Sequence, residues 1–311
     1  MSILRRRWVI DDIVIILRKV PLFRISSKIY KILQYFYFRK ERKKNIYLKN
    51  IHNGGKCYII GNGISASVLG IEELRSSYVF ACNEIFNHKK FKEMRIDYYT
   101  VMEPFYGRIL GKKYVQDTLK LYTEISGAFQ EKKSTLFFNA SLKRFFGSNG
   151  LFENNKVNFL TPLSKSEKGA YNDLHGKFTF GEGAFNFMVA SAIYMGFKEI
   201  YLIGCGYTYS PRQQFHFYSR PSYLKSKYSY EAMIQKVKKD YLKEGLKITS
   251  IEENDLSYLP VITSPFKDDS ISKNQVQIRE FANANSTKIV NITPGGYDSP
   301  IFESIKENEL Y

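Results

Sequence analysis

The sequence predicts an α/β fold: a Rossmann-like, mainly parallel sheet flanked by helices, with a basic amphipathic helical arm at the N-terminus. The sheet follows from the order of segments. From residue 57 onward, short apolar runs alternate with helical stretches, as in parallel strands joined by crossover helices. Glycine-rich or polar residues follow several of these runs, at the edge where such sheets bind ligands. The arm follows from a concentration of positive charge before residue 57.

The expected strands are short runs rich in Ile, Val, Tyr and Phe. Helices are expected at Ala184–Met195, which is apolar nearly all round and therefore buried, and at Tyr230–Leu242 and Ser272–Ala284. Residues 205–229 lack clear periodicity and are expected to form a lid. The expected strands are Cys57–Ile60, Tyr78–Ala81, Tyr98–Met102, Thr135–Phe138, Glu199–Ile203, Lys247–Ser250 and Lys288–Asn291.

The composition is that of a globular protein with a substantial core. The chain has 311 residues, of which 44% are hydrophobic. Its three cysteines, Cys57, Cys82 and Cys205, fall in or just after apolar runs and do not have the spacing of metal ligands. We therefore expect buried, reduced thiols, which favour a cytoplasmic location.

The positive charge is concentrated near the N-terminus. Residues 1–56 hold 15 Lys and Arg against three acids, a net charge of +12, whereas the whole chain carries +17. Asp11 and Asp12 interrupt the apolar stretch that follows Arg5–Arg7, so we do not expect a signal peptide. No apolar run approaches the ~18 residues of a membrane-spanning helix.

Residues 22–36 have helical spacing, with apolar side chains on one face and basic ones on another. Such a helix suits the surface of an anionic membrane; a helix packed on the body with a solvated basic face is the alternative. No recognition motif for nucleic acid accompanies the charge, and no such partner is expected. The sequence thus indicates a membrane-associating arm (residues 1–50) and a Rossmann-like domain (residues 51–311), separated by a linker at Arg39–Asn45.

A glycine-rich turn, Gly61-Asn62-Gly63, follows the first expected strand. Such turns bring bare backbone close to a ligand, often a phosphate. Residues 61–66 formally satisfy the dinucleotide-binding pattern, but the second strand ends in Asn83 where that pattern needs an acid for the ribose. An amide can pair with a base edge or a ribose. The turn therefore indicates a pocket for a mononucleotide.

Several motifs resemble known families. The stretches "YIIGNGISA", "FACNEIF" and "GEGAFNFMVASAIYMGFKEIYLIGCGYTY" are similar to bacterial CMP-sialic acid-dependent sialyltransferases of lipooligosaccharide synthesis. The stretches "DYYTVMEP", "HFY" and "IVNITPGG" resemble a wider group of surface-polysaccharide proteins, related to archaeal hydroxymethylpterin pyrophosphokinases. The resemblance covers roughly residues 56–250 and the last strand.

The resemblance implies roles for individual residues. The turn after the first strand would bind the nucleotide and its phosphate, Asn83 would contact the ribose or base, and Gly183 would open a helix facing the donor. Tyr207 and Tyr209 would hydrogen-bond the departing phosphate. The implied donor-binding residues are Gly61, Asn62, Gly63, Ser65, Asn83, Gly183 and Tyr218.

Two side chains are candidates for the general base. His216 lies in the expected lid, where an imidazole could take the proton of an attacking sugar hydroxyl near neutral pH. Glu103, after the third strand, is the rival. His52 and His88 are expected at the surface, and His175 near the mouth of the cleft. No metal cluster and no cofactor are expected, because a CMP donor leaves as a monophosphate ester and needs less charge neutralisation than a diphosphate.

The resemblance implies a glycosyltransferase on the cytoplasmic face of the membrane, which moves a CMP-activated 2-keto-3-deoxy sugar onto a glycan or glycolipid acceptor of lipopolysaccharide or capsule. Net inversion follows from the resemblance alone. Two alternatives stay open: an ATP-dependent pyrophosphokinase-like enzyme, and a catalytically silent scaffold. The scaffold stays open because the sialyltransferase pattern has an acid at Gly206 and a histidine where this chain has Tyr223–Ser226. The sequence also leaves homo-oligomerisation open.

Overall fold

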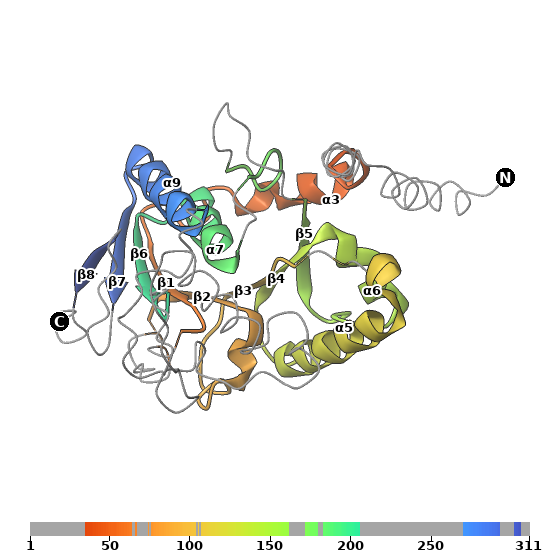
Figure 1. Ribbon diagram of the computed structural model, residues 1–311. Coiled ribbons are helices and arrows are strands. Elements are labelled where there is room, and N and C mark those ends of the chain that lie inside the picture. Colours follow the sequence, from red (N-terminus) through yellow and green to blue (C-terminus); the bar gives the residue numbers. More distant parts are fainter. Residues whose placement is uncertain are drawn as a thin grey trace, which may run out of the picture.

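A computed structural model describes residues 35–63, 66, 74, 76–103, 105, 107–161, 172–179, 183–205, 270–292 and 302–305. The strands of these residues form one sheet in the order β5-β4-β3-β2-β1-β6-β7-β8 (Figure 1), and every pairing is parallel. The expected α/β class is therefore confirmed. The strands are β1 (Lys56–Ile60), β2 (Tyr78–Cys82), β3 (Tyr98–Val101), β4 (Thr135–Asn139), β5 (Lys156–Leu160), β6 (Glu199–Ile203), β7 (Lys288–Ile292) and β8 (Glu303–Ile305).

Most expected strands match these elements to within one residue at each end. The expected strand Lys247–Ser250 and the expected helix Tyr230–Leu242 lie outside the described residues. The sequence analysis missed β5, β8 and the long helix α5 (Gly107–Phe129). The expected helices at 184–195 and 272–284 are present as α7 (Ala184–Tyr194) and α9 (Ser270–Ala284).

Both faces of the sheet are covered. Along β1, Cys57 and Ile59 belong to one hydrophobic cluster, whereas Tyr58 and Ile60 belong to another. The first cluster includes residues of α7 and α9, and the second includes residues of α5 and of α6 (Lys143–Ser148). Figure 1 shows these pairs of helices on opposite sides of the sheet. Burial on both faces explains why the strands are continuous apolar runs.

The segment before β1 caps helix α7. Asn50, His52 and Gly54 donate their backbone N–H groups to the carbonyls of Tyr194, Met195 and Gly196. These carbonyls lie at the end of α7, where helical C=O groups lack partners within the helix. The C-terminus of α7 therefore lies beside the start of β1. Its N-terminus lies at the opposite edge of the sheet, where the parallel strands end.

The stretch expected as a linker is instead helical and packed on the domain. It forms α3 (Arg39–Lys43) and the 3₁₀ helix η1 (Lys44–Leu48). Arg42 and Asn45 are buried, and the Asn45 amide donates to the backbone carbonyls of Phe159 in β5 and of Leu174. The run of charged residues suggests a solvated linker. The sequence does not reveal the buried contacts, because the partners of Arg42 and Asn45 are distant in the chain.

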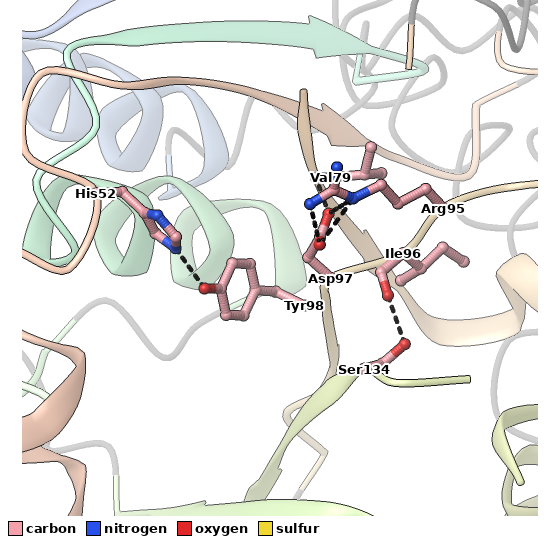
Figure 2. A network of polar contacts seen from close by, with 7 residues as sticks. All are labelled: His52, Val79, Arg95, Ile96, Asp97, Tyr98 and Ser134. Atoms are coloured by element: carbon pink, nitrogen blue, oxygen red, sulfur yellow. Dashed lines mark hydrogen bonds and ion pairs between the residues drawn. The ribbon is translucent and has the colours of Figure 1, made fainter. Parts of the chain in front are cut away.

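A polar network holds the edge of the sheet where the strands begin (Figure 2). The Asp97 carboxylate accepts from the backbone N–H of Val79 at 2.9 Å, and from Nε of Arg95 at 2.9 Å and 3.0 Å. His52 and the Tyr98 hydroxyl form a hydrogen bond of 2.5 Å. The His52 ring also stacks on Phe197, and burial lowers its pKa. This network joins the starts of β2 and β3 to the segment that caps α7.

Asp97→Ala should lower the free energy of unfolding by about 1–3 kcal/mol, because it leaves the Val79 N–H without its acceptor. Arg95→Ala should cost less than about 1 kcal/mol, because the Arg95 side chain is 43% exposed and a surface ion pair contributes little. Urea unfolding of the two variants and the parent measures both values. Equal losses in the two variants would mean that the ion pair, and not the backbone contact, stabilises this edge.

Candidate functional site

The candidate site lies at the carboxyl edge of the sheet, between β1 and β6. The chain runs outward from β1 to β5 on one side of the sheet and from β6 to β8 on the other, so the strand order reverses between β1 and β6. Ligands of open parallel sheets bind at such a point, beyond the carboxyl ends of the strands. The turn Gly61-Asn62-Gly63 follows β1, and Gly204-Cys205 follows β6.

These two turns are in direct backbone contact. The N–H of Gly61 donates to the carbonyl of Ile203 at 2.7 Å, and the N–H of Gly63 donates to the carbonyl of Gly204 at 2.9 Å. A Cβ at Gly61 would lie 2.4 Å from the Gly204 oxygen, and one at Gly63 would lie 2.7 Å from it. The glycines of the turn are therefore required by the close approach of β6. Their two amides are bound to carbonyls of the protein.

The two asparagines expected to bind the nucleotide lie at neighbouring strand ends. Ile60 pairs with Ala81, so Asn62 and Asn83 follow their strands in the same register. Asn62 is 5% exposed, and Asn83 is half-buried with a left-handed φ of 48°. The Tyr99 hydroxyl donates to the Asn83 carbonyl at 2.6 Å and holds this turn. The structure thus places the two asparagines that the sequence singled out at the ends of neighbouring strands.

The expectation that His88 lies at the surface is wrong, because this residue is 4% exposed. The backbone N–H of Lys90 donates to His88 Nδ1, so Nε2 carries the proton and donates to the Ala66 carbonyl at 3.1 Å. Burial lowers the pKa of His88, which favours this neutral form. The imidazole thereby ties Ala66, just after the glycine turn, to the loop after β2. Sequence reasoning missed this role, since a single histidine in a polar stretch carries no local signal.

The loop that carries Glu103 is anchored to the end of β4. The backbone N–H of Phe105 donates to Ser141 Oγ at 2.8 Å, and the Ser141 hydroxyl donates to Asn139 Oδ1 at 2.8 Å. Glu103 itself is exposed, just beyond the end of β3. Sequence reasoning missed Asn139 and Ser141. The polar pair directly after an apolar strand is the signal that could have indicated a capped turn.

Helix α7 points its N-terminus toward the same edge and packs across β1, β2 and β3. Gly183 precedes the helix with a φ of 82°, a conformation that favours glycine, and a Cβ there would meet nothing within 4 Å. The first turn of α7 contains no acidic residue. Its N–H groups and the positive end of its dipole therefore suit an anion.

Other expected site residues lie outside the described residues: Ser65, Tyr207, Tyr209, His216 and Tyr218. The structure places His175 away from the expected cleft mouth. Its Nδ1 lies 2.7 Å from the hydroxyl of Tyr194, in the last turn of α7, whereas Gly183 marks the other end of that helix.

The described residues contain no group of three or more His, Cys, Asp and Glu side chains that could hold a metal ion. None of the described helices combines the length and apolarity needed to cross a bilayer.

The three cysteines are free thiols; two of them are buried, as expected, whereas Cys205 is partly exposed. Cys57 and Cys82 are buried in β1 and β2, and burial raises the pKa of both. Burial also raises the pKa of Cys205 to about 12. All three therefore stay protonated near neutral pH, and none has the lowered pKa of a nucleophilic cysteine.

Gly61→Ala should lower the free energy of unfolding by about 1–3 kcal/mol, because the added methyl group meets the backbone of Gly204 and forces the two turns apart. Gly127→Ala is the matched control in α5, where a Cβ has open space. That change should leave the stability unchanged or raise it by less than about 1 kcal/mol, because alanine favours a helix and Gly127 lies in the last turn of α5. Urea unfolding compares the two variants. A Gly61→Ala protein as stable as the parent would show that the turns can separate freely.

No protein-family model and no curated protein matches the chain. Among solved structures, the chain is similar to the MAf glycosyltransferase from Magnetospirillum magneticum AMB-1, with 14% sequence identity and a TM-score of 0.31. The match covers 84% of this chain and 46% of that chain, so this chain spans less than half the length of the glycosyltransferase. A likeness at this level does not extend to substrates or to mechanism.

Proposed function

We propose that the protein is a glycosyltransferase. It moves a CMP-activated 2-keto-3-deoxy sugar, such as a sialic acid-like nonulosonate or Kdo, onto a hydroxyl of a surface glycan or glycolipid at the inner face of the membrane. One observation carries the proposal: Asn62 follows β1, at the reversal point of the sheet, and Asn83 follows the neighbouring strand β2, on the edge toward which α7 points its N-terminus. These are the positions that the resemblance to sialyltransferases assigns to the nucleotide and its phosphate.

The arrangement suits a nucleoside monophosphate. Each asparagine amide offers donors and an acceptor, which can pair with a base edge or with ribose hydroxyls. The amides of Gly61 and Gly63 are bound to carbonyls that belong to β6 and the turn after it, so the phosphate needs other donors. The first N–H groups of α7 supply them, and the helix dipole favours the negative charge that builds up as CMP departs.

The reaction asks three things of the protein. It must hold the acceptor hydroxyl near the anomeric carbon, remove the proton of that hydroxyl, and stabilise the leaving phosphate. In the proposed mechanism, His216 removes the proton, with Glu103 as the rival base, and Tyr207 and Tyr209 hydrogen-bond the departing phosphate. The resemblance implies inversion at the anomeric carbon.

CMP should raise the thermal midpoint of the protein without a divalent metal ion. A ligand at 100 times its dissociation constant adds about 2.7 kcal/mol to the stability of the folded state. The test is a thermal-shift panel of CMP, CDP, UDP, GDP and ATP, each with and without Mg²⁺ or Mn²⁺. Stabilisation only by ATP with Mg²⁺ would indicate a pyrophosphokinase-like enzyme, and stabilisation by no nucleotide would indicate a scaffold. Either result would overturn the proposal.

Within the same panel, Asn83→Gly should abolish the response to CMP. Glycine adopts the left-handed conformation of Asn83, so the change removes the amide and keeps the backbone. Asn50→Gly is the matched control: Asn50 also has a positive φ, of 57°, but it lies at the opposite edge of the sheet. The control should respond to CMP like the parent. An undiminished response of the Asn83→Gly protein would remove Asn83 from the nucleotide site.

His216→Ala should lose turnover by about 10²–10⁴-fold, as expected on removal of a general base, while its response to CMP stays unchanged. Glu103→Gln is the paired variant. Release of CMP from a CMP-sugar in the presence of acceptor measures turnover. Normal turnover of His216→Ala together with loss in Glu103→Gln would assign the base to Glu103.

A further inference from the structure

The exposed hydrophobic side chains gather in one segment. Among the described residues, every large hydrophobic side chain that is exposed lies between residues 36 and 51. A soluble protein exposes single apolar residues over its whole surface, but a cluster of them marks an interaction site. The exposed fractions are 65% for Phe36, 50% for Tyr37, 49% for Ile46, 45% for Ile51 and 39% for Tyr47.

The polarity of this segment is inverted relative to an ordinary surface helix, which buries its apolar face. Here the buried side chains are Leu48 and two polar ones, Arg42 and Asn45, which donate hydrogen bonds to the domain. Arg42 Nη1 donates to the carbonyl of Tyr35 at 2.6 Å and to Thr161 Oγ1 at 3.2 Å. Asn45 donates to carbonyls at 3.3 Å and 3.1 Å. These contacts hold the segment on the domain while five of its aliphatic and aromatic residues stay exposed and Leu48 is buried.

Exposed basic side chains are interspersed with the apolar ones along the segment. Arg39, Lys40, Lys43, Lys44 and Lys49 are all exposed. Glu41 is the single acid between residues 36 and 51, and it forms ion pairs with Lys44 and with Lys143 of α6. The outward face therefore combines apolar side chains with uncompensated positive charge.

We propose that the outward face of residues 36–51 docks the folded domain onto an anionic lipid surface. Ile, Phe and Tyr side chains enter the interfacial region of a bilayer, and Lys and Arg attract acidic headgroups. A second copy of the chain fits less well, because two such faces would bring like charges together. Nucleic acid would use the basic residues but not Ile46 and Ile51.

This surface differs from the arm helix expected over residues 22–36, but it lies largely within the part of the chain expected to associate with a membrane. It deepens the proposed function, because it names the surface that would hold the domain at the membrane. It belongs to the domain itself, through the buried contacts of Arg42 and Asn45 with residues in and beside β5. A membrane bound at this face would therefore hold the sheet in a fixed orientation. The proposal stands independently of the reaction at the other site, because its test needs no substrate.

The test measures co-sedimentation of the full chain with vesicles of phosphatidylcholine alone and of phosphatidylcholine mixed with phosphatidylglycerol. The parent protein should bind the mixed vesicles only. Ile46→Ser with Ile51→Ser, which leaves the charge unchanged, should weaken binding by about tenfold or more, the equivalent of two buried methylene groups. Lys40→Glu with Lys43→Glu should weaken it by at least about 25-fold.

Lys112→Glu with Lys113→Glu is the matched control. It makes the same charge change on exposed residues of α5, across the sheet from α7 and α9. Only the net charge of the protein changes there, so the affinity for the mixed vesicles should stay within about threefold of that of the parent. A loss as large as that of the Lys40/Lys43 variant would show non-specific attraction and overturn the proposal. So would full binding by the Ile46/Ile51 variant.

Sedimentation velocity of the parent and of the Ile46/Ile51 variant tests whether a second copy of the chain binds this face instead. A monomer in both cases is the expected result. A parent dimer that the serine substitutions convert to monomer would assign the face to self-association and overturn the lipid proposal. An unchanged thermal midpoint of each variant shows that the loss of binding does not come from unfolding.

Discussion

The structure depends on the close approach of β1 and β6. These strands meet where the strand order reverses, and their turns touch through backbone atoms. The contact requires glycine at positions 61, 63 and 204, because any other residue at these positions would place its Cβ within 3.0 Å of the facing turn. The contact fixes the position of Asn62 in the turn after β1. Through the pairing of β1 with β2, it also sets where Asn83 lies relative to Asn62.

The glycine turn therefore has a different physical basis from the one that its sequence suggests. A Gly-x-Gly turn after a strand indicates backbone that approaches a ligand, yet here it approaches a second turn of the same chain. Asn62, between the two glycines, and Asn83, after β2, keep their proposed role in nucleotide binding. What changes is the expected source of phosphate contacts, which moves from the glycine amides to the N-terminus of α7.

The sequence predicts the central sheet well, because strands that are buried on both faces are continuous apolar runs. It fails at β5, where Lys156 and Asn158 interrupt the apolar pattern of a strand at the edge of the described sheet. It also places Asn62 and Asn83 just after strands, where the structure has them, and their role in nucleotide binding stays a prediction. It does not find the pairs His88–Ala66 and Ser141–Phe105, because their partners lie 22 and 36 residues apart and only the fold brings them together.

The segment that carries the outward basic and apolar face has another consequence, which concerns aggregation. The Asn45 amide occupies the backbone carbonyl of Phe159 in the edge strand β5, and the Tyr47 hydroxyl binds the side chain of Asn158 beside it. An edge strand with free carbonyls is a template onto which another chain can add a strand. A protein that lacks residues 1–51 would thus lose both the outward face and the side chains that cover β5. We expect such truncated molecules to associate through their β5 edges, so the deletion would lower the solubility of the protein.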